Sequence, residues 1–194
     1  MSSRGLRRSR SPGFFYTGGL AMPDPGQWWW HLIFHTLGSW LHGDPRGFRS
    51  RDHRIHSSGD YKNPPPSGEH DKLHQYHRRR SRVVKLAPNL YPSVGCAVQN
   101  KCDKSNRRVL AISVDATHVH ALVQLPDDYE VVRRFAAGLK QASSHAVREV
   151  LSGRVWAGGG KPIRIRDRVH HRRVFAYILE HASEGAWVWR EAET

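Results

Sequence analysis

The stretch that decides the fold lies at residues 107–126, "RRVLAISVDATHVHALVQLP". It contains two apolar segments separated by a short turn, and the second ends at Pro126, which has no N–H to donate to a sheet. Two strands so close in the chain are expected to pair as a hairpin. Strand side chains alternate between two faces, so the first strand is expected to divide into two sets: Val109, Ala111 and Ser113, against Leu110, Ile112 and Val114.

Before this hairpin, the chain predicts a strand, a long irregular segment and a helix. Residues 28–37, "WWWHLIFHTL", are rich in aromatic and β-branched types, which indicates a central or well-covered strand. Residues 42–71 combine prolines, turn residues and scattered charge, so we expect an irregular excursion. Residues 89–101 repeat apolar side chains at intervals of three and four, as a short amphipathic helix does.

After the hairpin, residues 128–151 predict the clearest helix of the chain. Asp127 or Asp128 is expected to cap its first turn, because a carboxylate there accepts from free backbone N–H groups. Its apolar stripe is expected to consist of Val132, Phe135, Leu139, Ala142, Ala146 and Val150.

The last part of the domain predicts a flexible link, a strand and a final helix. Gly158–Gly160 form the link, and residues 161–167, "KPIRIRD", alternate apolar and basic side chains as a strand does. Residues 168–182, "RVHHRRVFAYILEHA", read as a helix on which Tyr177 and His181 share one face. This strand and helix complete the pattern that begins at residue 28.

The predicted order is strand, helix, strand, strand, helix, strand, with one extra helix. It fits an α+β fold: a ferredoxin-like or RRM-like antiparallel sheet (βαββαβ) with an additional C-terminal helix that carries the tyrosine. Residues 25–190 are expected to form this one domain, with an irregular insertion at about 42–71. Residues 1–24 combine Arg, Ser, Gly and Pro without periodicity, as a flexible basic tail does.

The charge of the chain points to a polyanionic partner. It has 31 Lys and Arg against 17 Asp and Glu, a formal net charge of +14. Such an excess favours nucleic acid, with an acidic membrane surface as the alternative. No apolar run approaches the length of a spanning helix, and the N-terminus lacks a secretory signal, so we expect a cytoplasmic protein without a membrane partner. Cys96 and Cys102 match no zinc or disulfide spacing and are expected to be free thiols.

Two histidines of the hairpin are candidate metal ligands. His118 and His120 flank Val119, so on a strand their imidazoles project from the same face. Such a pair is also found as ordinary strand residues, and a third ligand is needed. His181 is that candidate, because a final helix laid across the sheet would bring it to the pair with Tyr177 beside it.

These residues carry a resemblance to the HUH single-tyrosine transposases, which include insertion-sequence enzymes and REP-associated tyrosine transposases. His118-Val119-His120 is similar to the histidine-hydrophobe-histidine motif, and "YILEH", residues 177–181, looks like the tyrosine helix. The resemblance covers roughly residues 28–190. Members of the family usually have Gln or Asn four residues after the tyrosine, where this chain has His181, a competent ligand of another kind.

The resemblance implies a metal-dependent DNA transposase that nicks and rejoins DNA. Tyr177 would be the nucleophile and would form a covalent 5′-phosphotyrosine, and His118, His120 and His181 would hold a divalent metal, Mg²⁺ or Mn²⁺. Three imidazoles suit Mn²⁺ better than Mg²⁺. The implied partner is single-stranded DNA with hairpins, and a homodimer is one assembly that the family allows.

The basic and aromatic side chains are candidate DNA contacts. Phosphate contact is expected at Arg78, Arg79, Arg80, Arg82, Arg133, Lys140, Arg164 and Arg166, with a solvated helix face as the alternative. Stacking on unpaired bases is a role for Trp28, Trp29, Trp30, Tyr76 and Trp156, with core packing as the alternative. Two other functions stay open: a non-catalytic or domesticated nucleic-acid-binding protein on the same scaffold, and an HUH replication initiator.

Overall fold

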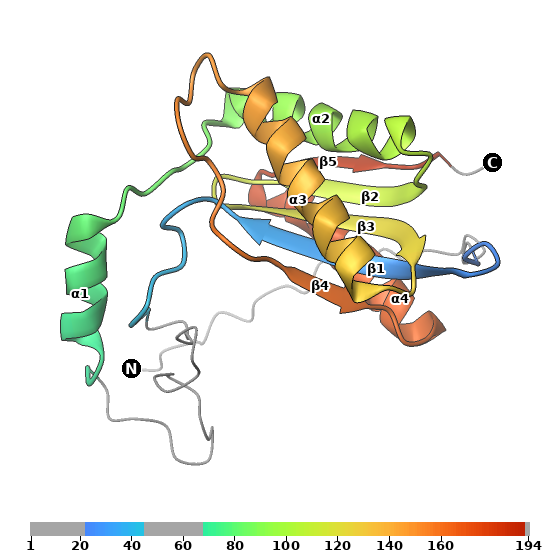
Figure 1. Ribbon diagram of the computed structural model, residues 1–194, viewed down its shortest axis with the longest axis horizontal. Coiled ribbons are helices and arrows are strands. Elements are labelled where there is room, and N and C mark those ends of the chain that lie inside the picture. Colours follow the sequence, from blue (N-terminus) through green and yellow to red (C-terminus); the bar gives the residue numbers. More distant parts are fainter. Residues whose placement is uncertain (1–21, 45–67, 193–194) are drawn as a thin grey trace, which may run out of the picture.

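The computed structural model describes residues 22–44 and 68–192. Within them, five strands form one sheet in the order β4-β1-β3-β2-β5, and every neighbouring pair is antiparallel (Figure 1). The predicted α+β, ferredoxin-like fold is therefore confirmed, and the sheet has one strand more than expected. The strands are β1 (Gln27–His35), β2 (Val109–Val114), β3 (His118–Pro126), β4 (Lys161–Arg164) and β5 (Trp187–Arg190).

The predicted hairpin forms, but its first strand contains a bulge. β2 pairs with β3 from Val114 opposite Val119 back to Val109 opposite Val123, and the register shifts between Val109 and Ala111. A bulge adds one residue to one strand and reverses the faces beyond it. Val109 therefore packs in the same core as Ile112 and Val114, and the predicted division into alternating faces is wrong at this end: Leu110 and Ala111 lie in the core on the opposite side of the sheet.

β1 lies between β3 and β4, as expected for a strand with apolar side chains on both faces. Trp30, Leu32 and Phe34 belong to the core on one face, whereas Trp29 belongs to the core on the other. The alternation of a strand places His31 on the same face as Trp29.

Helices cover both faces of the sheet. α2 (Tyr91–Lys104) and α3 (Tyr129–Ala146) lie on one face, and α4 (Arg168–Glu180) lies on the other (Figure 1). α2 approaches β5 closely because Gly95 has no side chain, and a Cβ atom at that position would collide with the Trp187 ring. α1 (Asp71–Arg80) buries no residue and stands apart from the sheet. The chain also forms two short 3₁₀ helices, η1 (Pro88–Leu90) and η2 (His181–Glu184).

α3 begins as predicted and ends earlier. The Asp128 carboxylate accepts hydrogen bonds from the N–H groups of Glu130 at 2.8 Å and Val131 at 3.1 Å. The helix ends at Ala146 rather than at residue 151, and Val150 is 67% exposed. The predicted stripe therefore fails at its C-terminal end, since side chains beyond the last helical turn no longer repeat on one face.

Some of the predictions fall outside the described residues. Most of the basic tail, at residues 1–21, and most of the irregular insertion, at residues 45–67, belong to this group. In the described part, none of the helices is both long and apolar enough to cross a membrane.

Candidate metal and nucleophile site

β3 presents two histidines to the face that α4 covers. The strand places His118 and His120 on one side of the sheet and sends Val119, which is fully buried, into the opposite layer. His120 is buried and His118 is half-buried. The two rings lie 4.7 Å apart, so the strand alone brings two imidazoles to one point.

α4 and the turn after it add a third imidazole and a phenol. The His181 ring lies 4.9 Å from that of His120 and 5.4 Å from that of His118. The Tyr177 ring lies 5.3 Å from His120 and 4.8 Å from His181. Tyr177 is 45% exposed, so its phenol is accessible to a large substrate while it borders the histidines.

The three histidines have the geometry of a small-ion site. Each offers one nitrogen, and these atoms all lie within 4.8 Å of one another. The Nε2 atoms of His120 and His181 are buried and have no hydrogen-bond partner. Because buried polar atoms are nearly always paired, two unpaired nitrogens that border the same point suit a bound ligand. The residues thus fit a divalent metal with imidazole ligands.

Each of the three imidazole rings is held by a contact at its Nδ1 atom. His118 Nδ1 lies 2.8 Å from Asp115 Oδ2. His120 Nδ1 lies 2.8 Å from His31 Nε2, and His181 Nδ1 lies 3.1 Å from Glu184 Oε2. Metal-binding histidines are usually oriented in this way, with the remote nitrogen bonded to a carboxylate or another acceptor. The arrangement leaves Nε2 of all three rings for a ligand.

Asp115 is itself fixed by the turn between β2 and β3. Its Oδ1 accepts from the N–H groups of Thr117 at 2.6 Å and His118 at 2.7 Å. Burial alone would raise the pKa of this carboxyl, but the hydrogen bonds from His118 and from the backbone outweigh it and lower the pKa to about 2. Asp115 is therefore a carboxylate at neutral pH and keeps His118 oriented.

The site favours a neutral imidazole at His120 and at His31, and a protonated phenol at Tyr177. Burial, with His118, His31 and His181 nearby, lowers the pKa of His120 to about 2, and burial lowers that of His31 to about 4. A neutral imidazole is the form that binds metal. Burial and the carboxylates of Glu184, Asp115 and Glu180 raise the pKa of Tyr177, so the phenol must lose its proton when it reacts.

Three residues of this site have no counterpart in the sequence prediction: His31, Asp115 and Glu184. Asp115 stands three residues before His118, and Glu184 three residues after His181, so proximity in the chain was a usable signal for both. His31 had no such signal. It meets His120 only because β1 pairs with β3, with His31 opposite Leu122.

The predicted DNA-contact cations do not form one group. Arg78, Arg79 and Arg80 lie on the separate helix α1 and are exposed. Four others are engaged within the protein: Arg82 bonds to the Ser152 carbonyl, Arg133 to Glu130, Arg164 to Asp127, and Lys140 to the carbonyls of Ala157 and Gly159. Arg166 is exposed next to the start of α4.

The five aromatic side chains that are candidates for base stacking fall into two groups by burial. Trp29, Trp30 and Trp156 are buried, so core packing accounts for them. Trp28, at 37% exposed, and Tyr76, at 51%, remain on the surface. The Arg80 guanidinium stacks on Tyr76 at 4.4 Å from the ring centroid, and that of Arg164 on Trp28 at 3.8 Å.

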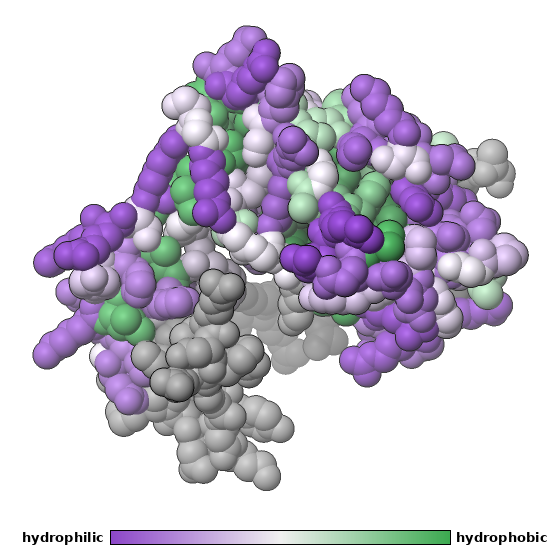
Figure 2. All heavy atoms as spheres, in the orientation of Figure 1, coloured by the Kyte–Doolittle hydropathy of each residue, from purple (hydrophilic) through white to green (hydrophobic). Residues whose placement is uncertain are grey.

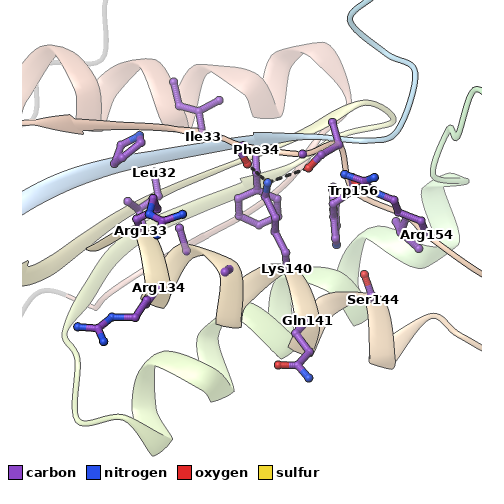
Figure 3. A pocket seen from close by; sticks show the side chains of 18 of the residues that line it. Leu32, Ile33, Phe34, Arg133, Arg134, Lys140, Gln141, Ser144, Arg154 and Trp156 are labelled. Atoms are coloured by element: carbon purple, nitrogen blue, oxygen red, sulfur yellow. Dashed lines mark hydrogen bonds between the residues drawn. The ribbon is translucent and has the colours of Figure 1, made fainter. Parts of the chain in front are cut away.

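A large basic hollow of about 520 Å³ lies on the opposite face of the sheet from the histidines. Figure 3 shows Phe34, Leu32 and Trp156 along it, with Lys140, Arg133 and Arg134 reaching from α3 and Arg154 from the following loop. Hydrophilic side chains cover most of this face, and hydrophobic ones show between them (Figure 2). The hollow therefore combines an apolar floor with cations, separately from the histidine site.

Residues 72–159 match the sequence profile of the family described as "Transposase IS200 like". This match confirms the resemblance of the chain to the HUH single-tyrosine transposases. The matched residues include His118 and His120 and end before α4, so Tyr177 and His181 lie outside the match. No curated protein is significantly similar to the chain in sequence.

Two solved structures are similar to this chain. One is a REP-associated tyrosine transposase bound to a REP hairpin, with 15% identity, a TM-score of 0.45, and coverage of 87% of this chain and 73% of the other. The second is a candidate transposase from Deinococcus radiodurans R1, with 13% identity, a TM-score of 0.42, and coverage of 92% and 98%.

Proposed function

We propose that the protein is a metal-dependent endonuclease and strand transferase for single-stranded DNA, with Tyr177 as its nucleophile. The observation that carries this proposal is the Tyr177 phenol beside three imidazoles, two of which have a buried Nε2 atom without a partner. The similarity of residues 72–159 to a transposase family supports the same reading. His118, His120 and His181 would hold Mg²⁺ or Mn²⁺, and the bound ion would neutralise charge on the scissile phosphate.

The proposed reaction conserves the phosphodiester. The Tyr177 oxygen attacks the phosphorus and loses its proton, the bond from phosphorus to the 3′-oxygen breaks, and the departing oxygen takes up a proton. One strand end then carries a 5′-phosphotyrosine and the other a free 3′-hydroxyl. A different 3′-hydroxyl can attack the phosphotyrosine and restore Tyr177, so rejoining needs no external energy source.

The cations supply the proposed contacts to DNA. Arg78, Arg79 and Arg80 are exposed on α1 and suit the phosphate backbone. The Arg80 guanidinium bonds to Tyr76 on the same helix. Arg133 and Lys140 line the basic hollow, which suits a second part of the same DNA. Arg82, Arg164 and Arg166 are proposed as further phosphate contacts.

One experiment tests the nucleophile. Purified protein is incubated with Mn²⁺ and labelled single-stranded DNA taken from the sequence that flanks its gene, and the products are separated under denaturing conditions. We expect an adduct in which the label migrates with the protein. Tyr177→Phe should remove the adduct, and Tyr91→Phe, a matched change of a tyrosine on α2 in the core of the opposite face, should leave it unchanged.

The result also separates the alternatives. A protein that binds the DNA with no adduct under any metal is a non-catalytic binder, and the proposal fails. An adduct that survives Tyr177→Phe assigns the nucleophile to another residue and contradicts the proposed role of Tyr177.

A further inference from the structure

A small pocket lies on the same side of the sheet as the histidine site, at the other end of α4. Its volume is about 150 Å³, and Trp28, Trp29, Ile165, Asp167 and His171 contribute to its lining. At about 15 Å³ for each water-sized atom, the pocket has room for roughly ten such atoms. This is the size of a single nucleobase.

His171 is the unusual group in this pocket. It is only 5% exposed, and neither ring nitrogen has a hydrogen-bond partner. The ring lies edge-on to Trp29, with the centroids 5.6 Å apart. Burial and the neighbouring His170 lower the pKa of His171 to about 4, so the ring is neutral at pH 7. Both nitrogens are buried, so the ring forms part of the pocket wall beside Trp29.

The rim of the pocket is aromatic and basic. Trp28 is 37% exposed, and the Arg164 guanidinium stacks 3.8 Å from its ring centroid while it pairs with Asp127 at 3.0 Å. Arg166 and Arg168 border the pocket and are exposed. Flat aromatic surfaces with adjacent cations are typical of sites that stack unpaired bases.

The charge inside the pocket disfavours a phosphate. Asp167 lines it and accepts a hydrogen bond from the His170 N–H at 2.8 Å, and this carboxylate occupies the N-terminus of α4 where an anion would otherwise bind. The remaining lining is mostly apolar. An uncharged ring therefore fits inside, and the phosphates on either side of it fit the arginines at the rim.

We propose that this pocket holds one unpaired base of the DNA strand that Tyr177 attacks, with the base stacked against Trp28 and bordered by His171. The inference rests on the proposed function. From His171 to Tyr177 the helix rises about 9 Å, at 1.5 Å per residue. At the duplex spacing of about 3.4 Å per nucleotide, about 9 Å corresponds to about three nucleotides. An unpaired strand can extend further per nucleotide, so the base lies within about three nucleotides of the scissile phosphate.

The test uses a series of single-stranded oligonucleotides with the sequence of the DNA that flanks the gene. Each oligonucleotide carries one abasic site, and the site is at a different nucleotide in each. The full chain carries Tyr177→Phe so that the strand is not cut, and affinity is measured by fluorescence anisotropy. We expect one position near the cleavage site at which loss of the base weakens binding roughly tenfold. In a protein that also carries His171→Phe, the abasic site at that position should not weaken DNA binding any further. His170→Gln, a change of the neighbouring residue outside the pocket lining, should keep the tenfold effect.

The outcomes separate this inference from the proposed function. If no abasic position stands out, or if His171→Phe leaves the tenfold effect in place, the pocket does not hold a base, even when the adduct with Tyr177 forms. If single-stranded DNA does not bind at all, both proposals fail. Trp28→Ala repeats the test at the exposed rim, so the inference stays open to refutation if His171→Phe does not fold.

Discussion

The two faces of the sheet differ in the buried histidines that they carry. The face under α2 and α3 packs a large apolar core and holds no buried histidine in the described residues. The face under α4 has a smaller apolar core and all four of the buried histidines there: His31, His120, His171 and His181. Three of these four have ring nitrogens without a partner. The difference indicates that one face stabilises the fold, whereas the other gives up some stability for a site.

The largest expected effect on folding comes from the core under α2 and α3. Leu125 is fully buried in it, so Leu125→Ala should lower the free energy of unfolding by about 2–5 kcal/mol. Urea denaturation monitored by circular dichroism measures the change. Mn²⁺ affinity of the folded variant should stay at the wild-type value, and a large loss would mean that the two faces are not separate in role.

A smaller effect is expected where the α4 face orients its ligands. Asp115→Asn replaces the carboxylate that holds His118 and should weaken Mn²⁺ binding by about 10–100-fold. Isothermal titration calorimetry gives the affinity. Asp127→Asn is the matched control, since Asp127 pairs with Arg164 and not with the histidine site. Equal losses in both variants would count against an orienting role for Asp115.

Acid should destabilise the α4 face selectively. The pKa values of His31 and His171 are lowered from 6.5 to about 4, so between these values the unfolded state binds more protons than the folded state. Stability should therefore fall as the pH drops below about 6.5, by on the order of 1 kcal/mol for each histidine at pH 5.5. Urea midpoints at pH 7.5 and 5.5 test this. His171→Phe should lose about two thirds as much as the wild type, because His31 and His120, whose pKa is lowered to about 2, still contribute.

The smallest expected effect is an increase in the stability of the protein. His181→Leu removes a buried nitrogen that has no partner, and the other nitrogen pairs only with Glu184, whose side chain is 70% exposed. In metal-free buffer the variant should be more stable by about 1 kcal/mol. Added Mn²⁺ should raise the melting temperature of the wild type but not of the variant. A destabilised variant would mean that His181 serves the core rather than a ligand.

The local elements of the fold follow from the sequence because short-range chemistry decides them. Alternating apolar residues predict β2 and β3, and Asp128 marks the start of α3 by accepting from the first free N–H groups. The bulge at Val109 was not predictable, since alternation continues through it in the sequence. The sequence did not predict β5. Its four residues, "WVWR", come shortly after η2 and form a strand only by pairing with β2.

The candidate site divides in the same way. By itself, the sequence determines that His118 and His120 point together, because a strand has a period of two. It also places Tyr177 and His181 one turn apart on the same side, although α4 ends at Glu180 and His181 begins η2. Only the tertiary structure decides that α4 crosses the sheet at this point, that His31 holds His120 across the β1–β3 pairing, and that His171 is buried without a partner. Periodicity acts within one element, whereas these contacts depend on the packing of elements that are far apart in the chain.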